Sequence, residues 1–204
     1  MDYQTLASKE TVEKVIEALK PRGIRAELVE TKEEALERIK AMLPEGAELM
    51  TGSSTTLEQI GFTDLLKSKN HPWKNLKDEI LAEKDPLKQK ELRKKSVTAQ
   101  YFLGSVHAVG ENGEVLDASA SGSQIPSYAF SSDNIIWVVG AHKIVPTLED
   151  GLERIRKYVL PLEDKRMKIL GYPGSTIGKL LIFEQEVMPN RIITLIFVNE
   201  KLGF

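Results

Sequence analysis

The sequence predicts an α/β fold: an open, mostly parallel sheet with flanking helices, a β-hairpin and a helical insert. Helical and strand-like patterns alternate in residues 6–50 and again in residues 135–159, which is typical of helices packed on a parallel sheet. An Asn-Gly pair at 112–113 separates two apolar runs and predicts the hairpin. A basic segment at about 64–100 interrupts the alternation. We therefore expect one domain over residues 1–204 that carries this insert.

The first helix and strand follow from hydrophobic periodicity. Apolar residues within 1–20 share one helical face, and Pro21 ends that pattern. Apolar and charged residues then alternate over 24–28, which indicates a half-buried strand.

A second helix and a short strand come next. Thr31 and Glu34 have the spacing of a capping box, in which the two residues bond reciprocally at a helix start. The helix is expected to run towards Leu43, and Leu49 and Met50 then form a short buried strand.

The hairpin is expected to pair residues 106–109 with 115–118, around a turn at 111–114. The Asn-Gly pair predicts a turn in which both central residues have positive φ. Further along, residues 135–139 indicate a buried strand, 147–159 a helix, and 192–198 a final buried strand.

The segment 64–100 has ten Lys or Arg against six Asp or Glu, a net charge of +4. We interpret it as a helical, partly exposed insert over the sheet edge. A solvated helical face is the favoured interpretation. A basic lid over an anionic ligand is the main alternative, and nucleic-acid binding is disfavoured because no aromatic residues are interleaved with the charges.

Composition limits the classes of function. The chain has 204 residues, a net charge of −2 and no cysteine. The small net charge gives no reason to expect nucleic acid or membrane partners. Without cysteine there are no disulfides, thiolate metal sites or Cys-held clusters, and we expect a cytoplasmic protein with no metal and no cofactor.

The first candidate site is the loop at 51–61. Gly52, Ser53, Ser54, Thr55 and Thr56 lie between a strand and a helix, where open α/β sheets place ligands. A helix N-terminus can hold a carboxylate or phosphate through its free N–H groups. A helix that is capped by its own side chains and binds no ligand is the alternative.

Glu58 belongs to the same loop and has two predicted roles. With Thr55 it has capping-box spacing. It is also a candidate base if the protein is an isomerase or acyl-transferase.

The second candidate site is the small-residue stretch at 118–127, which follows the hairpin. Ser121, Ser123 and Gln124 could donate hydrogen bonds to an anion, and Gly122 could form a tight turn. A flexible surface turn is the alternative.

His107, Asp117 and His142 are further candidates for catalysis. Histidine can act as a general base or bind a metal, but the spacing of the three histidines does not match a metal motif. A structural hydrogen-bonding role is therefore favoured for each histidine. The stretch 174–180 superficially resembles a P-loop, but it has one residue too few between its glycines and Leu180 in place of Ser or Thr, which disfavours ATP binding.

Several ordered motifs resemble the LUD-domain (lactate utilisation) family. They are the GSSTTLEQIG stretch at 52–61, the hairpin at 105–116, the turn at 121–124, the strand and helix at 135–155, and the closing VNEKLGF at 198–204. The resemblance implies a Rossmann-like fold similar to the sugar-phosphate isomerase and CoA-transferase group. It also implies a link to L-lactate oxidation, with iron–sulfur proteins as partners.

Three departures from the family pattern limit this resemblance. His107 stands where many relatives carry Asn or Asp, and the turn at 118–122 lacks the Asp that commonly precedes Thr-Gly. Many short relatives have a cysteine cluster near 173–190, which is absent here, so this chain cannot hold an iron–sulfur cluster there.

We therefore expect a component of organic-acid metabolism that binds a small carboxylate or phosphate-type ligand. The alternatives are a non-catalytic scaffold subunit of an oxidoreductase complex and an isomerase or acyl-transferase-like enzyme. A homo-oligomer is a further expectation.

Overall fold

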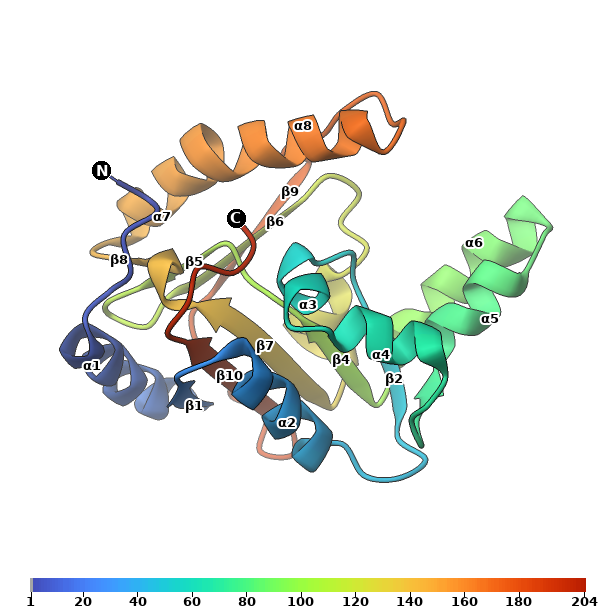
Figure 1. The fold of residues 1–204 in the computed structure, drawn as a ribbon, viewed down its shortest axis with the longest axis horizontal. Coiled ribbons are helices and arrows are strands. Elements are labelled where there is room, and N and C mark those ends of the chain that lie inside the picture. Colours follow the sequence, from blue (N-terminus) through green and yellow to red (C-terminus); the bar gives the residue numbers. More distant parts are fainter. Residues whose placement is uncertain (1) are drawn as a thin grey trace.

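A computed structural model describes residues 2–204 of the chain (Figure 1). Its larger sheet has six parallel strands in the order β1-β10-β7-β4-β2-β3. This arrangement confirms the predicted open, mostly parallel α/β sheet. The strands are β1 (Ile24–Val29), β2 (Glu48–Thr51), β3 (Lys74–Asn75), β4 (Tyr101–Gly104), β7 (Asn134–Gly140) and β10 (Ile192–Val198).

The central strand β7 separates two hydrophobic cores. Ile135, Trp137 and Val139 point to the core that includes α1 (Lys9–Leu19). Ile136 and Val138 point to the opposite core, beneath the helices that follow β1 and β2. Because successive side chains of a strand face opposite sides, one apolar run supplies both cores.

A second sheet of four strands packs beside the first, in the order β8-β5-β6-β9. β5 (Ala108–Gly110) and β6 (Val115–Ser119) form the predicted antiparallel hairpin. β8 (Ile144–Val145) adds to it in parallel, and β9 (Lys179–Phe183) pairs antiparallel with β6. The sequence did not predict β8 or β9 as strands of this sheet.

The hairpin turn differs from the predicted type. Gly113 has a φ of 95°, but Asn112 does not have a positive φ. Gly113 N–H donates to Gly110 O at 2.9 Å, and Gly110 N–H donates to Glu114 O at 2.8 Å. The loop therefore has three residues and ends on a glycine, a geometry in which only that glycine needs positive φ.

The helix starts confirm some capping predictions and correct others. Thr31 caps α2 (Lys32–Met42) by accepting from Glu34 N–H. The Glu34 carboxylate accepts from the N–H of Glu30 instead of Thr31. The predicted Thr55 cap is wrong, because Ser54 caps α3 (Thr55–Gln59) by accepting from Leu57 N–H. The first helix begins at Lys9, after an N-cap at Ser8.

The basic segment at 64–100 divides into two parts. α4 (Phe62–Ser68) packs into the second core through Phe62 and Leu66, and Trp73 joins them there. α5 (Leu76–Ala82) and α6 (Pro86–Lys95) then form a helical hairpin that projects from the side of the molecule (Figure 1). α6 buries none of its residues.

One long, irregular helix lies across the second sheet, at the top of Figure 1. It consists of α7 (Leu148–Arg154), a π-helical turn at Ile155–Val159 and α8 (Leu160–Ile169). It extends ten residues beyond the predicted end at position 159. Within residues 2–204, no helix has the length and apolarity needed to span a membrane.

Candidate functional site

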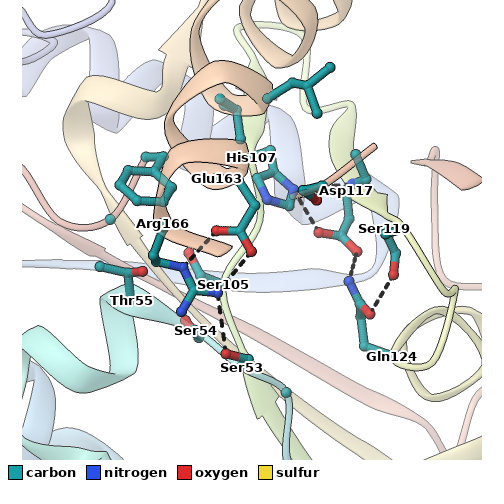
Figure 2. Close-up of a pocket in the computed structure, with 18 of the residues that line it drawn as sticks. Ser53, Ser54, Thr55, Ser105, His107, Asp117, Ser119, Gln124, Glu163 and Arg166 are labelled. Atoms are coloured by element: carbon teal, nitrogen blue, oxygen red, sulfur yellow. Dashed lines mark hydrogen bonds and ion pairs between the residues drawn. The ribbon is translucent and has the colours of Figure 1, made fainter. Parts of the chain in front are cut away.

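A cavity of about 500 Å³ lies between the carboxyl edge of the larger sheet and the helix α8. Its walls come from the segments that follow β2 and β4, from the end of β6, and from the inner face of α8 (Figure 2). This position matches the rule that open α/β sheets bind ligands outside the carboxyl ends of their strands.

The first predicted loop lines this cavity. Gly52, Ser53, Ser54, Thr55 and Thr56 all contribute to its wall. A Cβ at Gly52 would meet no atom within 4 Å, so the missing side chain leaves space open.

Helix polarity contributes little at this loop. α3 has only five residues, and a macrodipole needs several aligned peptide units. Ser54 Oγ already accepts from Leu57 N–H. Glu58, a candidate base if the protein is an isomerase or acyl-transferase, is exposed and lies outside the cavity wall. The side-chain hydroxyls are therefore the relevant donors here.

The second predicted loop lines the opposite wall through Ser121, Ser123 and Gln124. Gly122 does not line the cavity; it forms the turn itself, with a φ of 84°. Gln124 Nε2 donates to Asp117 Oδ2 at 3.1 Å, and Ser119 Oγ–H donates to Gln124 Oε1 at 2.9 Å. The loop thus supports Asp117 through an ordered chain of hydrogen bonds (Figure 2).

His107 and Asp117 form a pair in the cavity (Figure 2). Asp117 Oδ1 lies 2.8 Å from His107 Nδ1, and the Asp117 side chain is only 3% exposed. The N–H of Ala118 also approaches Nδ1, at 3.1 Å, but Nδ1 cannot both donate to a carboxylate and accept from an amide. We assign the proton to Nδ1 because the contact with the carboxylate is the shorter and charge-assisted one. Nε2 is then the basic nitrogen of the ring.

Arg154 supports His107 from behind. Its guanidinium is fully buried, and Nη1 donates to the carbonyl oxygen of His107. Burial lowers the Arg154 pKa to about 10, so the side chain is still charged at neutral pH. The Tyr158 ring lies 5.1 Å from its guanidinium carbon, where a cation–π contact offsets part of the burial.

His142 does not belong to this site. It is 3% exposed and does not line the cavity. Burial, with smaller effects from Lys143 and Arg154, lowers the pKa of His142 to about 3. The ring is therefore neutral at physiological pH. Its buried Nδ1 has no hydrogen-bond partner in the described part of the chain, so the expected hydrogen-bonding role is not seen at this nitrogen.

Lys143 is the main residue that sequence reasoning did not single out. It directly follows His142, lines the cavity floor and is 2% exposed. Its Nζ lies 3.2 Å from Thr56 Oγ1, 3.0 Å from Ser105 Oγ and 3.1 Å from Val106 O. The sequence shows only that a lysine follows a buried strand. Its contacts with Thr56, Ser105 and Val106 depend on the fold.

A second missed pair lies on α8. Arg166 Nε and Nη2 bind both oxygens of Glu163, at 2.7 and 2.8 Å. Nη2 also donates to Ser53 Oγ at 3.4 Å. These contacts leave Arg166 Nη1 for a ligand. Glu163 supports the guanidinium chiefly through its hydrogen bond, which raises the Arg166 pKa.

The stretch that resembles a P-loop also reaches the cavity. Residues 174–177 line it, and Ser175 N–H donates to Asp164 Oδ1 at 2.9 Å. This stretch leads into strand β9 instead of a helix, so it lacks the strand-to-helix geometry of a P-loop. Within residues 2–204 we find no group of three His, Asp or Glu side chains placed to hold a metal ion.

Comparison with known proteins identifies the family. The model of the LUD domain matches residues 12–196. The chain belongs to the LUD-domain family. A crystal structure of a DUF162 family protein from Deinococcus radiodurans resembles this LUD-domain chain with a TM-score of 0.56 and 14% identity. The alignment covers 96% of this chain and 100% of that one, and at this identity it supports the fold alone. No curated protein matches the chain.

Proposed function

We propose that this LUD-domain protein binds a small organic anion, such as a hydroxy or oxo carboxylate, and transfers a proton to or from it. The observation that carries the proposal is the pairing of His107 with Asp117 inside a cavity lined by hydroxyls and by Arg166. The protein would thereby act in organic-acid metabolism, consistent with a role in lactate utilisation.

Arg166 provides the charge that would bind the anion. Glu163 holds the guanidinium in place from one edge, and Nη1 offers two further N–H donors. A carboxylate bound there would lie next to the hydroxyl of Ser53, which Arg166 already contacts. Charge-assisted hydrogen bonds to arginine are among the stronger polar contacts in proteins.

His107 would supply the proton-transfer step. Asp117 fixes the ring so that Nε2 can accept a proton, as an orienting carboxylate does for a general base. The Asp117 carboxylate is itself held by Gln124. Any oxidation of the bound acid by a Cys-ligated iron–sulfur cluster would require a partner protein, because the chain has no cysteine.

A binding screen tests the first part of the proposal. Thermal unfolding is measured with millimolar L-lactate, pyruvate, inorganic phosphate and a neutral amide as control. An acid present at 100 times its Kd raises the free energy of unfolding by about 2.7 kcal/mol. Stabilisation by one carboxylate is expected, and no stabilisation by any of the anions contradicts the proposal.

Matched variants locate the binding site. Arg166→Gln should weaken binding of the stabilising acid, whereas Lys165→Gln removes the same charge from an exposed neighbour and should leave binding intact. Equal losses in both variants would mean that only net charge matters. His107→Gln should retain binding but stop exchange of the acid's α-proton with solvent, followed by NMR in D₂O.

A non-catalytic subunit is the second candidate, and the surface of α8 favours it. Ile169 and Leu170, at the end of the helix, are 76% and 57% exposed, and Tyr172 is 58% exposed. Neighbouring exposed apolar residues are common at protein interfaces. Under this alternative, Ile169→Asp abolishes growth on an organic acid and His107→Gln does not. Growth that is lost with His107→Gln and kept with Ile169→Asp supports catalysis.

A further inference from the structure

Ser105 and Lys143 form a close contact on the cavity floor that the proposed proton transfer does not use. Ser105 follows the carboxyl end of β4, is partly exposed and lines the cavity. Its Oγ lies 3.0 Å from Nζ of Lys143, which is almost completely buried behind it. The hydroxyl is thus accessible from the cavity while the amine is shielded from solvent.

The surroundings of Lys143 favour an uncharged amine. Its three hydrogen-bond partners are the hydroxyls of Thr56 and Ser105 and the carbonyl of Val106, none of which carries a negative charge. Burial, assisted by the charge of Arg154 and only partly opposed by that of Asp117, lowers the Lys143 pKa well below its usual value. A lysine whose pKa is lowered in this way is a better candidate for a general base than an exposed lysine.

Every polar hydrogen of this cluster can be placed with the amine uncharged. The Thr56 hydroxyl donates to the carbonyl oxygen of Leu202, 3.3 Å away. The two N–H groups of Lys143 then donate to Val106 O and Thr56 Oγ1. The lone pair of Nζ then faces the Ser105 hydroxyl at 3.0 Å, closer than the other acceptor of its proton, Val106 O at 3.3 Å. Acceptance of that proton by Nζ is the arrangement that a serine nucleophile requires of its base.

We propose that Ser105 and Lys143 act as a nucleophile and general base, which gives this protein an acyl-transfer or hydrolase activity towards small esters or thioesters. This activity goes beyond the anion binding and proton transfer proposed above, because it uses other side chains and proceeds through a covalent intermediate. Serine paired with lysine is a known variant of the serine nucleophile.

The proposed reaction has two balanced halves. Ser105 Oγ attacks the acyl carbon while its proton passes to Lys143 Nζ, and the leaving alcohol or thiol departs with that proton. Water, or another acceptor with a hydroxyl or amine, then attacks the acyl-serine, loses its proton to Lys143 and restores Ser105. No oxidant or metal is needed for either half.

Neighbouring residues hold Ser105 in position and surround it with donors. The Tyr128 hydroxyl donates to Ser105 O at 3.2 Å, and it packs so closely on Gly104 that a Cβ there would collide with the Tyr128 oxygen. Arg166 and Ser54 line the same cavity as Ser105 (Figure 2). These groups could stabilise negative charge that develops on an acyl oxygen.

Labelling with a fluorophosphonate tests the proposal, because this reagent modifies activated serines irreversibly. The intact protein is incubated with the reagent, and mass spectrometry gives the number of adducts, their position and the rate. We expect one adduct, on Ser105. Lys143→Met should slow labelling by about 100-fold or more, in line with loss of a general base.

Two comparisons distinguish a lysine that accepts a proton from one that acts through its positive charge alone. Lys143→Arg keeps a positive charge but cannot accept a proton at neutral pH, so it should label as slowly as Lys143→Met. Lys165→Met, an exposed substitution on α8, should label at the wild-type rate. Circular dichroism and thermal unfolding verify that each variant is folded.

Several outcomes would overturn the proposal. They are an unlabelled wild-type protein, an adduct on a serine other than Ser105, and a Lys143→Met variant that is folded and labels at the wild-type rate. A folded Lys143→Arg variant with rapid labelling would also do so, because it would show that charge alone activates the serine. A measurement of carboxylate binding to the same variants keeps this result separate from the anion-binding proposal.

Discussion

At the scale of single residues, the buried amine of Lys143 has a cost in stability that depends on pH. Its pKa is lowered well below 10.5 in the folded protein by burial, whereas in the unfolded chain it has its ordinary value. Between the folded-state and unfolded-state pKa values, the unfolded state binds a proton that the folded state does not. Acidification in this range therefore favours unfolding, and the cost of burying Lys143 diminishes as the pH rises towards about 10.

Comparison with Lys143→Met measures this effect. Methionine fills similar space and does not titrate, so the variant should be more stable than the wild type at pH 7. The difference should shrink by up to about 1.4 kcal/mol for each pH unit between roughly 7 and 10. Urea unfolding at pH 7, 8.5 and 9.5 gives the free energies. A constant difference over this range would mean that Lys143 is charged in the folded protein.

Gly52 allows a test of the space in the cavity. Its backbone does not need a positive φ, and a Cβ would meet no atom within 4 Å. Gly52→Val should therefore change the free energy of unfolding by no more than about 0.5 kcal/mol. It should nevertheless weaken binding of the stabilising carboxylate by tenfold or more, measured by calorimetry, because its methyl groups would occupy the cavity. Unchanged binding would place the ligand away from this loop.

At the scale of elements, the hairpin between β5 and β6 depends on Gly113. This residue has a φ of 95°, and a Cβ on it would lie 2.9 Å from Arg22 Cδ and 3.0 Å from the carbonyl of Ala18. Gly113→Ala should combine backbone strain of about 1–2 kcal/mol with this steric conflict. Gly171→Ala is a matched control, since Gly171 also has positive φ, 85°, but nothing within 4 Å. Chemical denaturation should show a larger decrease in the free energy of unfolding for Gly113→Ala. Equal decreases would mean that Arg22 and Ala18 move to accommodate the added methyl group at little cost.

The elements also show what the sequence alone can predict. Strands β1, β7 and β10 were predicted because their apolar patterns are local. The caps at Thr31 and Ser54 illustrate the limit. The loop at 51–61 contains several Ser and Thr residues in succession, so the sequence could not distinguish a cap at Ser54 from one at Thr55. Short strands such as β8, with two residues, carry too little pattern to be recognised.

The candidate site also contains residues that the sequence predicts and residues that it does not. Both small-residue loops could be predicted, because the residues that form a turn are adjacent in the sequence. Both loops line one cavity. Ser105, Lys143 and Arg166 were not predicted. They come from the end of β4, from the segment after β7 and from α8. The contact between Ser105 and Lys143 arises when β4 pairs with β7, and the contact between Arg166 and Ser53 arises when α8 packs over the loop after β2. No local spacing encodes such long-range contacts.

At the scale of the whole molecule, stability should be distributed unevenly. β7 and β10 lie inside the larger sheet and contribute to both hydrophobic cores, so their amides should exchange with solvent only through global unfolding. α6 buries none of its residues and projects with α5 from the side of the molecule (Figure 1). Its amides should exchange through local opening, at a much lower free energy.

Hydrogen exchange in the presence of a ligand would distinguish the two interpretations of this basic helical hairpin. α6 does not contribute to the cavity wall. Lys77 of α5 contacts the first loop, with its Nζ 3.2 Å from Gly52 O, but does not line the cavity either. A bound carboxylate should therefore protect peptides that cover 52–56, 119–128 and 160–177, and leave 84–95 unchanged. Exchange measured by mass spectrometry, with and without the stabilising acid, gives both patterns in one experiment. Strong protection of 84–95 would instead favour the basic lid, because α6 would have to move towards the cavity to become ordered by the ligand.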